Sequence, residues 1–147
     1  MLKEVAPADL YPYKLPHEFL NEYELNERCY ILLQNKVNKN PQELCILAIM
    51  YQRGVHVKQN AQKGFDLYCQ AAKLNCYYAT LNLAHILRDG DFYVKRNWML
   101  ARNLYVLALS LNSSCTRLQE FDDHYPEVQI TNLNIMEIIE KIQFETT

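Results

Sequence analysis

The sequence predicts an all-α protein, a right-handed α-α solenoid of helix pairs with degenerate repeats at its ends. Three observations support this fold class. One segment of the chain repeats itself, apolar residues recur at helical spacing, and turn formers are scarce, with 3 Gly and 5 Pro in 147 residues. Because β-sandwiches need many turns, this composition favours helices. The length fits one domain, and a hydrophobic fraction of 50% indicates an ordered globular chain.

The first 40 residues are expected to lead into the repeated segment. Residues 1–16 contain Pro7, Pro12 and Pro16 and are predicted to be irregular, because proline disfavours helix at its own position and at the preceding one. Residues 17–40 are predicted to form leading helices, including the second helix of a degenerate repeat.

The repeat consists of residues 41–75 and residues 76–112. Leu47 matches Leu83 at an offset of 36 residues, and the later pairs match at an offset of 37. The extra residue falls in the loop before Val94. A structural repeat tolerates an insertion confined to a loop, because loop length disturbs packing least.

The first helix of the first repeat has clear start and stop signals. Asn40 can act as the N-cap, Pro41 suits the first helical position, and Glu43 can complete a capping box. Gly54 follows the last periodic residue, where a left-handed C-cap is easiest for glycine. Spacing of i, i+3, i+4 and i+7 predicts an apolar face made of Leu44, Leu47, Ala48 and Tyr51.

The remaining helices of the two repeats follow the same pattern. Gly90 is expected to end the first helix of the second repeat, and Asn60 and Asn97 are the predicted N-caps of the second helices. Small residues at matched positions let paired helix backbones approach closely. These second helices carry Gly64, Phe65, Tyr68, Ala71 and Ala72 in one repeat, and Ala101, Leu104, Tyr105 and Ala108 in the other.

Residues 113–147 are predicted to form a degenerate repeat and a capping helix. Ser113 or Ser114 is expected to cap a helix that runs through Phe121, and Pro126 stops the polar stretch that follows. The last helix is expected to close the stack, because an end repeat must present one face to water. Its apolar residues are Leu133, Ile135, Met136, Ile138, Ile139 and Ile142.

The matched positions form an ordered set: Leu47, Ala48, Tyr51, Gly54, Val57, Lys63, Gly64, Leu67, Tyr68, Ala71 and Ala72, then Ala79, Leu83, Ala84, Leu87, Gly90, Val94, Ala101, Leu104, Tyr105 and Ala108. Over about residues 43–112 this set resembles the Sel-one-like repeat family, which is related to tetratricopeptide repeats. The chain departs from the family motif where Asn60 and Asn97 replace Asp and where Asn75 and Asn112 replace the closing Gly. Asparagine still caps helices and tolerates the left-handed conformation. The resemblance implies a stack of helix pairs that binds other proteins.

Charge and cysteine usage exclude several function classes. A net charge of -2 and a pI of about 6.1 argue against a nucleic-acid binder. The chain shows no apolar run that could span a bilayer and no apolar core of a signal peptide. Five cysteines without a C-x-x-C pair predict a reduced, cytoplasmic protein without a metal site. Some secreted members of the resembled family link cysteines spaced like Cys69 and Cys76, but structural thiols are expected here.

A search for catalytic residues finds little. His85 and Asp89 lie four residues apart and could share a helix face as a ligand pair, but nothing supplies further ligands. Two polar residues on an exposed face are therefore the favoured interpretation. Phosphate loops and nucleophile elbows are absent from the sequence. We predict no catalytic residue, no cofactor and no metal; a hydrolase would need His85 or His124.

Candidate partner-binding residues come from the positions that the repeat motif does not use. In related solenoids, a second stripe on the first helices lines the concave, peptide-binding side. An alternative is that Ile46 and Ile49 pack on the leading helices, and periodicity does not separate the two. Tyrosines add candidates because they offer large contact area at low entropic cost. The set is Ile46, Ile49, Arg53, Asn82, His85, Asp89, Tyr77, Tyr78 and Tyr93.

The predicted function is a non-enzymatic protein–protein interaction module, most specifically a bacterial immunity protein that occludes a cognate toxin. This hypothesis rests on the family resemblance, since small repeat proteins of this kind resemble that role in some bacteria. One alternative is an adaptor or regulatory scaffold for a signalling or envelope-stress partner. Another is a hydrolase acting on cell-wall or similar small substrates. The chain is expected to bind a protein but no nucleic acid or membrane, as a monomer or weak homodimer.

Overall fold

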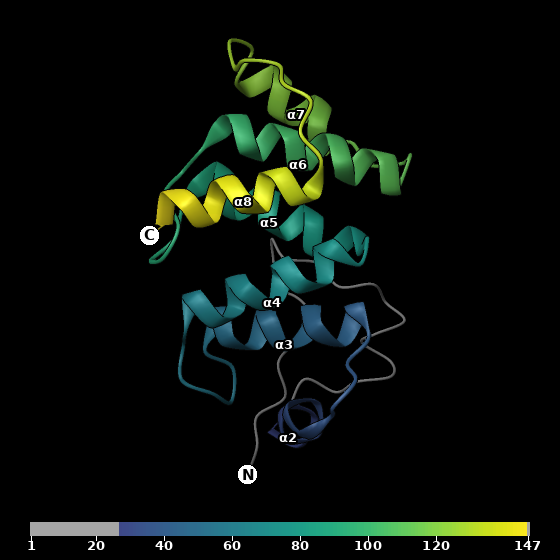
Figure 1. Cartoon of the computed structure of the whole chain (residues 1–147), viewed down its shortest axis with the longest axis vertical. Helices are drawn as coiled ribbons and strands as arrows, with labels where there is room; N and C mark the ends of the chain where they lie inside the picture. Colours follow the sequence, from purple (N-terminus) through teal and green to yellow (C-terminus); the bar gives the residue numbers. More distant parts are fainter. Residues whose placement is uncertain (1–26, 147) are drawn as a thin grey trace.

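The computed structural model describes residues 27–146, and the expectations for residues 1–16 and 17–26 lie outside this range. The predicted all-α fold of sequential helix pairs is confirmed: α3 packs against α4, α4 against α5, and α5 against α6 (Figure 1). In chain order the described helices are α2 (Glu27–Asn35), α3 (Pro41–Arg53), α4 (Ala61–Lys73), α5 (Tyr77–Asp89), α6 (Trp98–Leu111), α7 (Arg117–His124) and α8 (Ile135–Thr146).

The predicted capping box at the start of α3 is confirmed. The Glu43 backbone N–H donates to Asn40 Oδ1 at 2.8 Å, and the Asn40 N–H donates to Glu43 Oε1 at 3.0 Å. Glu43 is buried, and Lys36 neutralises it through an ion pair of 2.8 Å. At the other end Gly54 is left-handed, with φ 69°. Local sequence signals therefore fix both ends of this helix.

The other predicted caps are confirmed in part. Asn60 and Asn97 accept hydrogen bonds from the third residue of α4 and of α6, as predicted. Asn75 is left-handed, with φ 61°. Asn112 is extended instead, with φ -144°. Gly90 has a positive φ of 79° but a ψ of 160°, so it ends α5 without the left-handed helical conformation.

The expectation that Ser113 or Ser114 caps the next helix is wrong. The Ser114 N–H donates to the Asn112 side chain at 3.0 Å, which closes a turn. Helix α7 begins at Arg117, with Thr116 at the N-cap position and no side-chain capping hydrogen bond.

The first helices of both repeats are enclosed on all sides. Helix α3 contacts α2, α4 and α5, and all ten of its residues from Glu43 to Gln52 are buried. Helix α5 contacts α3, α4 and α6, and its residues from Ala79 to Leu87 are buried. The last residue of each helix, Arg53 in α3 and Asp89 in α5, is exposed.

The two paired helices of the first repeat approach each other closely at Gly64. A Cβ built there would lie 3.0 Å from the Ala48 carbonyl oxygen and 3.2 Å from the Gln52 backbone nitrogen. The second repeat has Ala101 at the matching position, where it is fully buried. The predicted role of small residues in helix pairing therefore holds at both positions.

Helix α8 does not close the end of the stack as expected. It folds back across the molecule, and its main contacts are with α6 and α4 (Figure 1). Its buried residues Ile138, Ile139 and Ile142 supply the apolar face for this packing, whereas Met136 is 57% exposed. Helix α8 therefore packs along the side of the helix stack, against α4 and α6, and does not cover its end.

The buried Asn103 side chain on α6 holds the segment that leads into α8. Its amide Nδ2 donates to Thr131 Oγ1 at 2.6 Å and to the Met99 carbonyl at 2.8 Å. Its Oδ1 accepts from the Leu133 N–H at 3.0 Å. One side chain therefore attaches the segment before α8 to the second repeat.

Replacing Asn103 by Ala is expected to lower the free energy of unfolding by about 1–3 kcal/mol, because the half-buried Thr131 and Leu133 lose their hydrogen-bond partner. Amide hydrogen exchange in α8 should accelerate more than exchange in α3. As a control, Gln119→Ala removes an exposed amide bonded to Asp123, and should change stability by about 0.5 kcal/mol or less. Equal effects of the two substitutions in urea unfolding would contradict this role of Asn103.

Candidate functional site

The stripe of predicted partner-binding residues is divided by burial. Ile46, Ile49 and Asn82 are 0% exposed, and His85 is 1% exposed. The burial of Ile46 and Ile49 agrees with the packing alternative, and none of the four side chains reaches the surface of α3 or α5. Arg53, at the end of α3, is exposed.

The expectation that His85 lies on an exposed helix face is wrong. Its Nδ1 is 2.8 Å from the Tyr105 hydroxyl, and the two rings meet edge to face. Burial lowers the pKa of His85 to about 4, and the nearby Arg88 and Arg117 act in the same direction. The imidazole is therefore neutral at pH 7 and serves packing between α5 and α6.

The structure brings Arg53 of the first repeat and Asp89 of the second repeat to one pocket. This pocket of about 570 Å³ lies between the loops that follow α3 and α5, and we call it the inter-repeat pocket. Two predicted site residues that lie 36 positions apart in the repeat thus become neighbours. The lining residues are Gln52, Arg53, Gln59, Ala61, Asp89, Gly90, Asp91 and Phe92.

Phe92 is a candidate that the sequence reasoning missed. Its side chain is 90% exposed at the rim of the inter-repeat pocket. A sequence signal for Phe92 was present, because the one-residue insertion of the second repeat falls in the loop that carries it. Tyr93, which was predicted, instead packs back on α4, with its ring 5.8 Å from that of Phe65.

The loop that carries Phe92 is held in place by Asp91. Its Oδ1 accepts from the Tyr93 N–H at 2.8 Å and from the Val94 N–H at 2.7 Å. Val94 is buried and fixes the far side of the loop. The second oxygen, Oδ2, is buried, and no described residue donates a hydrogen bond to it. The loop thus holds the Phe92 ring outward at the rim of the pocket.

A second pocket of about 490 Å³ lies between the end of α5, α6 and α7, and we call it the terminal pocket. Arg88 lines this pocket, while its neighbour Asp89 lines the inter-repeat pocket. The two side chains form a two-bond ion pair, with Nε–Oδ1 and Nη2–Oδ2 distances of 2.8 Å. The remaining lining residues are Tyr105, Arg117, Glu120, Phe121, Asp123, His124 and Tyr125.

Tyr77 and Tyr78, at the start of α5, are half-buried, and their rings stack edge to face at 4.9 Å. Neither lines the inter-repeat pocket or the terminal pocket. The structure therefore does not bring these two predicted residues together with Arg53 and Asp89.

Cys69 and Cys76, which were expected to be structural thiols, are both free, and Cys76 interacts with Cys45 instead. The buried Cys45 donates a hydrogen bond to Cys76, which lowers the pKa of Cys76 to about 7, helped by backbone N–H groups at the start of α5. Burial instead raises the pKa of Cys69 to about 12. The four cysteines described, Cys45, Cys69, Cys76 and Cys115, are free thiols.

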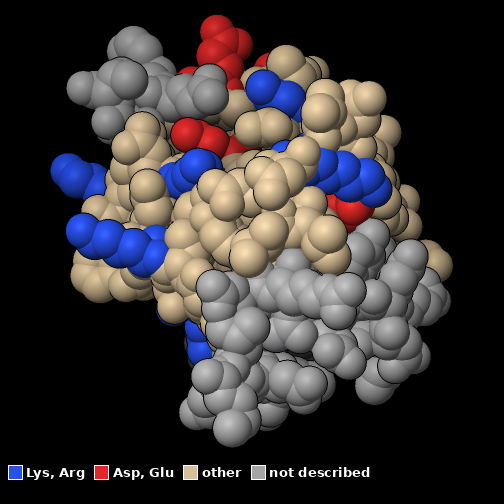
Figure 2. Space-filling model, turned by 90° about the horizontal axis from the view of Figure 1, so that it is seen from below, with Lys and Arg blue, Asp and Glu red and all other residues tan. Residues whose placement is uncertain are grey.

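On the face seen from below, the described residues are mostly uncharged, and their Lys, Arg, Asp and Glu side chains are scattered without a broad region of one charge (Figure 2). Among residues 27–146, no group of three or more histidine, cysteine or acidic residues is placed to hold a metal ion. No helix in the same range has the length and apolar character needed to cross a bilayer.

The family model for the Sel1 repeat matches the chain twice, over residues 44–76 and 78–113. The resemblance predicted from the ordered repeat positions is therefore confirmed. Comparison with curated proteins and with solved structures finds no match. Repeats of this kind build surfaces for protein–protein interaction.

The buried His85 predicts acid sensitivity. Its pKa of about 4 lies below the ordinary value of 6.5, so the unfolded chain binds the proton more readily between these values. Stability from this group is complete above pH 6.5 and is lost as the pH falls towards 4, by roughly 3 kcal/mol at most. Urea unfolding of the wild type and of His85→Gln across this range should show a shallower pH dependence for the variant. His124→Gln, which changes an exposed histidine, should retain the wild-type profile; identical profiles for all three would contradict the assignment.

Proposed function

Because the chain carries two Sel1 repeats, we propose that it is a non-enzymatic protein-binding module whose inter-repeat pocket holds a segment of its partner. The observation that supports this most is the exposure of Phe92, which is 90% accessible on a loop fixed by Asp91. An ordered, exposed aromatic beside a polar pocket is typical of a binding hot spot.

The groups around Phe92 suit a polypeptide ligand. Arg53 and Gln59 offer donors from the first repeat, and Asp89 and Asp91 offer acceptors from the second. A peptide presents both backbone N–H and C=O groups, so it can pair with both sides of this pocket.

The same geometry gives little support to the hydrolase alternative. Neither pocket is lined by a serine, threonine or cysteine nucleophile. His85 is buried and neutral, and its low pKa makes it a weak base. We therefore keep the module in the binding class.

At a finer level, we propose an immunity protein that occludes a cognate toxin. The preformed loop and pocket support this, because an interface that needs no ordering dissociates slowly. The adaptor alternative is supported by a second exposed apolar residue, Ile130, which is 73% exposed between α7 and α8 and lines neither pocket. An adaptor needs such a second contact region.

Affinity capture of the tagged chain from its host distinguishes these roles. One near-stoichiometric partner that is lethal when expressed alone, and that is neutralised by co-expression of the chain, would establish an immunity protein. Several weaker partners without toxicity would establish an adaptor and reject the immunity proposal.

Replacing Phe92 by Ala is expected to weaken partner binding at least tenfold, because the aromatic anchor is lost. The melting temperature should stay unchanged, since this side chain is almost fully exposed in the free chain. Val37→Ala is a matched control, because Val37 is 91% exposed and lies outside both pockets. Titration calorimetry with the captured partner measures the affinity of both variants, and thermal unfolding measures their melting temperatures. Unchanged affinity for Phe92→Ala would exclude the inter-repeat pocket as the interface.

A further inference from the structure

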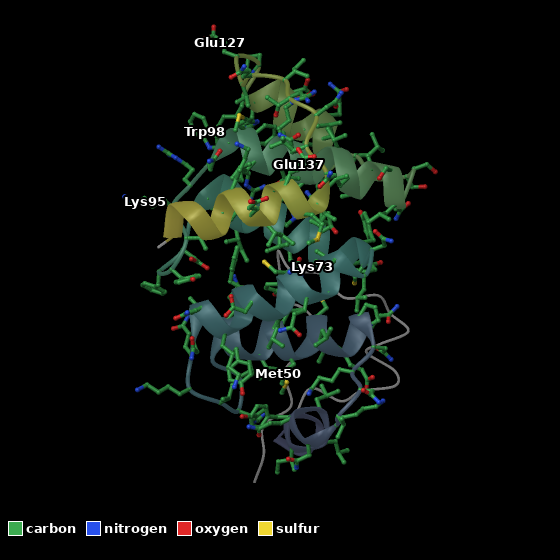
Figure 3. The ribbon with its side chains drawn as sticks, in the orientation of Figure 1. Met50, Lys73, Lys95, Trp98, Glu127 and Glu137 are labelled. Carbon is green, nitrogen blue, oxygen red and sulfur yellow. The ribbon has the colours of Figure 1, made fainter. Side chains whose placement is uncertain are left out.

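The terminal pocket combines groups from three helices. Arg88 comes from the last turn of α5, the buried Tyr105 from α6, and Arg117 from the first turn of α7. Residues 117, 120, 121 and 124 recur at i, i+3, i+4 and i+7, so one face of α7 covers the pocket. Trp98, the first residue of α6, is labelled in Figure 3, and its indole N–H donates to the Arg88 carbonyl at 3.1 Å.

The positive charges of this pocket lie deeper than the negative charges. The Arg88 side chain is 29% exposed, whereas its ion-pair partner Asp89 is 54% exposed. Arg117 is 28% exposed, whereas Glu120 is 57% exposed. In both pairs the arginine side chain is less exposed than the carboxylate side chain that it contacts.

An aromatic wall runs along the same pocket. The ring centroids of Tyr105 and Phe121 are 5.3 Å apart, and those of Phe121 and Tyr125 are 4.8 Å apart. Trp98 extends the series, with its ring 4.5 Å from that of Tyr125. Such a wall limits water around the guanidinium groups, and a lower local dielectric strengthens their attraction for an anion.

Glu120 shows which anion fits. Its Oε2 accepts from Arg117 Nη1 at 3.0 Å, so a carboxylate already occupies part of this guanidinium. The Glu120 side chain is 57% exposed, and an ion pair with an exposed partner contributes little to stability. A carboxylate from outside can therefore take the place of Glu120 at little cost.

We propose that the terminal pocket binds an acidic side chain of the protein partner, with the carboxylate on Arg117 and Arg88 and its methylene groups against the aromatic wall. This inference rests on the proposed protein-binding function and gives the chemistry of the bound segment. The Arg88–Asp89 ion pair joins this pocket to the inter-repeat pocket, so one partner segment contacts both.

The test uses a blocked peptide of four glutamates as the probe, with a blocked peptide of four glutamines as its neutral match. The chain has 1 Trp, and its position beside Tyr125 makes its fluorescence a reporter of this pocket. At constant ionic strength, the glutamate peptide is expected to change the Trp98 emission saturably with a dissociation constant of roughly 1 mM. The glutamine peptide should leave it unchanged. No saturation with the glutamate peptide, or equal effects of both, would overturn the proposal.

Variants separate binding from a structural effect. Arg117→Gln and Arg88→Gln should each weaken the glutamate peptide about tenfold, because a charge-assisted bond is lost. Glu120→Gln should bind it more tightly, because the competing carboxylate is gone. Arg102→Gln is the control, since it removes an ion pair to Asp122 of α7 but does not line the pocket. Equal weakening by Arg102→Gln, or unchanged binding by Arg117→Gln, would contradict the site.

This experiment needs no partner, so it is independent of the test of the proposed function. If the glutamate peptide binds saturably but Phe92→Ala keeps full affinity for the partner, the carboxylate site in the terminal pocket is supported and the inter-repeat interface is rejected. If the glutamate peptide does not saturate but Phe92→Ala weakens partner binding, the inter-repeat interface is supported and the carboxylate site is rejected.

Discussion

The enclosure of α3 and α5 is the constraint on which the rest of the structure depends. Because both helices are surrounded by neighbours, each polar side chain within them needs an internal partner. Glu43 pairs with Lys36, Gln52 accepts a hydrogen bond from Tyr68 at 3.1 Å, and His85 meets Tyr105. The exposed polar groups of these helices consequently lie at their ends and in the loops that follow, which line the inter-repeat pocket.

Much of this fold could be predicted from the sequence because its signals are local. The capping box at Asn40 and the left-handed Gly54 depend on residues within one turn of the helix end. The enclosure could not be predicted in the same way. Ile46 and Ile49 are apolar on a second face of α3, which fits burial on both sides and a binding groove equally well. Only the position of α2 and α5 decides between them.

The burial of Asn82 and His85, two polar members of the predicted stripe, could not be predicted for a related reason. Asn82 donates to Cys45 Sγ at 3.7 Å, and the partner of His85 lies on the next helix. No sequence pattern within one helical turn of Asn82 or His85 predicts these partners. Asn103 shows the same limit, since its partners Thr131 and Leu133 lie almost 30 residues away. Interactions that depend on tertiary packing leave no periodic trace in the sequence.

The ion pair between Arg88 and Asp89 gives the two proposed contact regions a physical connection. Arg88 uses two N–H donors on Asp89, so a partner cation that binds Asp89 returns those donors to the terminal pocket. A carboxylate bound in the terminal pocket can then accept more hydrogen bonds from Arg88. Under the proposals above, a partner segment with charges of both signs binds better than the sum of its separate charges, because each contact releases the group that the other needs. Two consecutive residues at a helix end thus favour a mixed-charge partner over a uniformly acidic one.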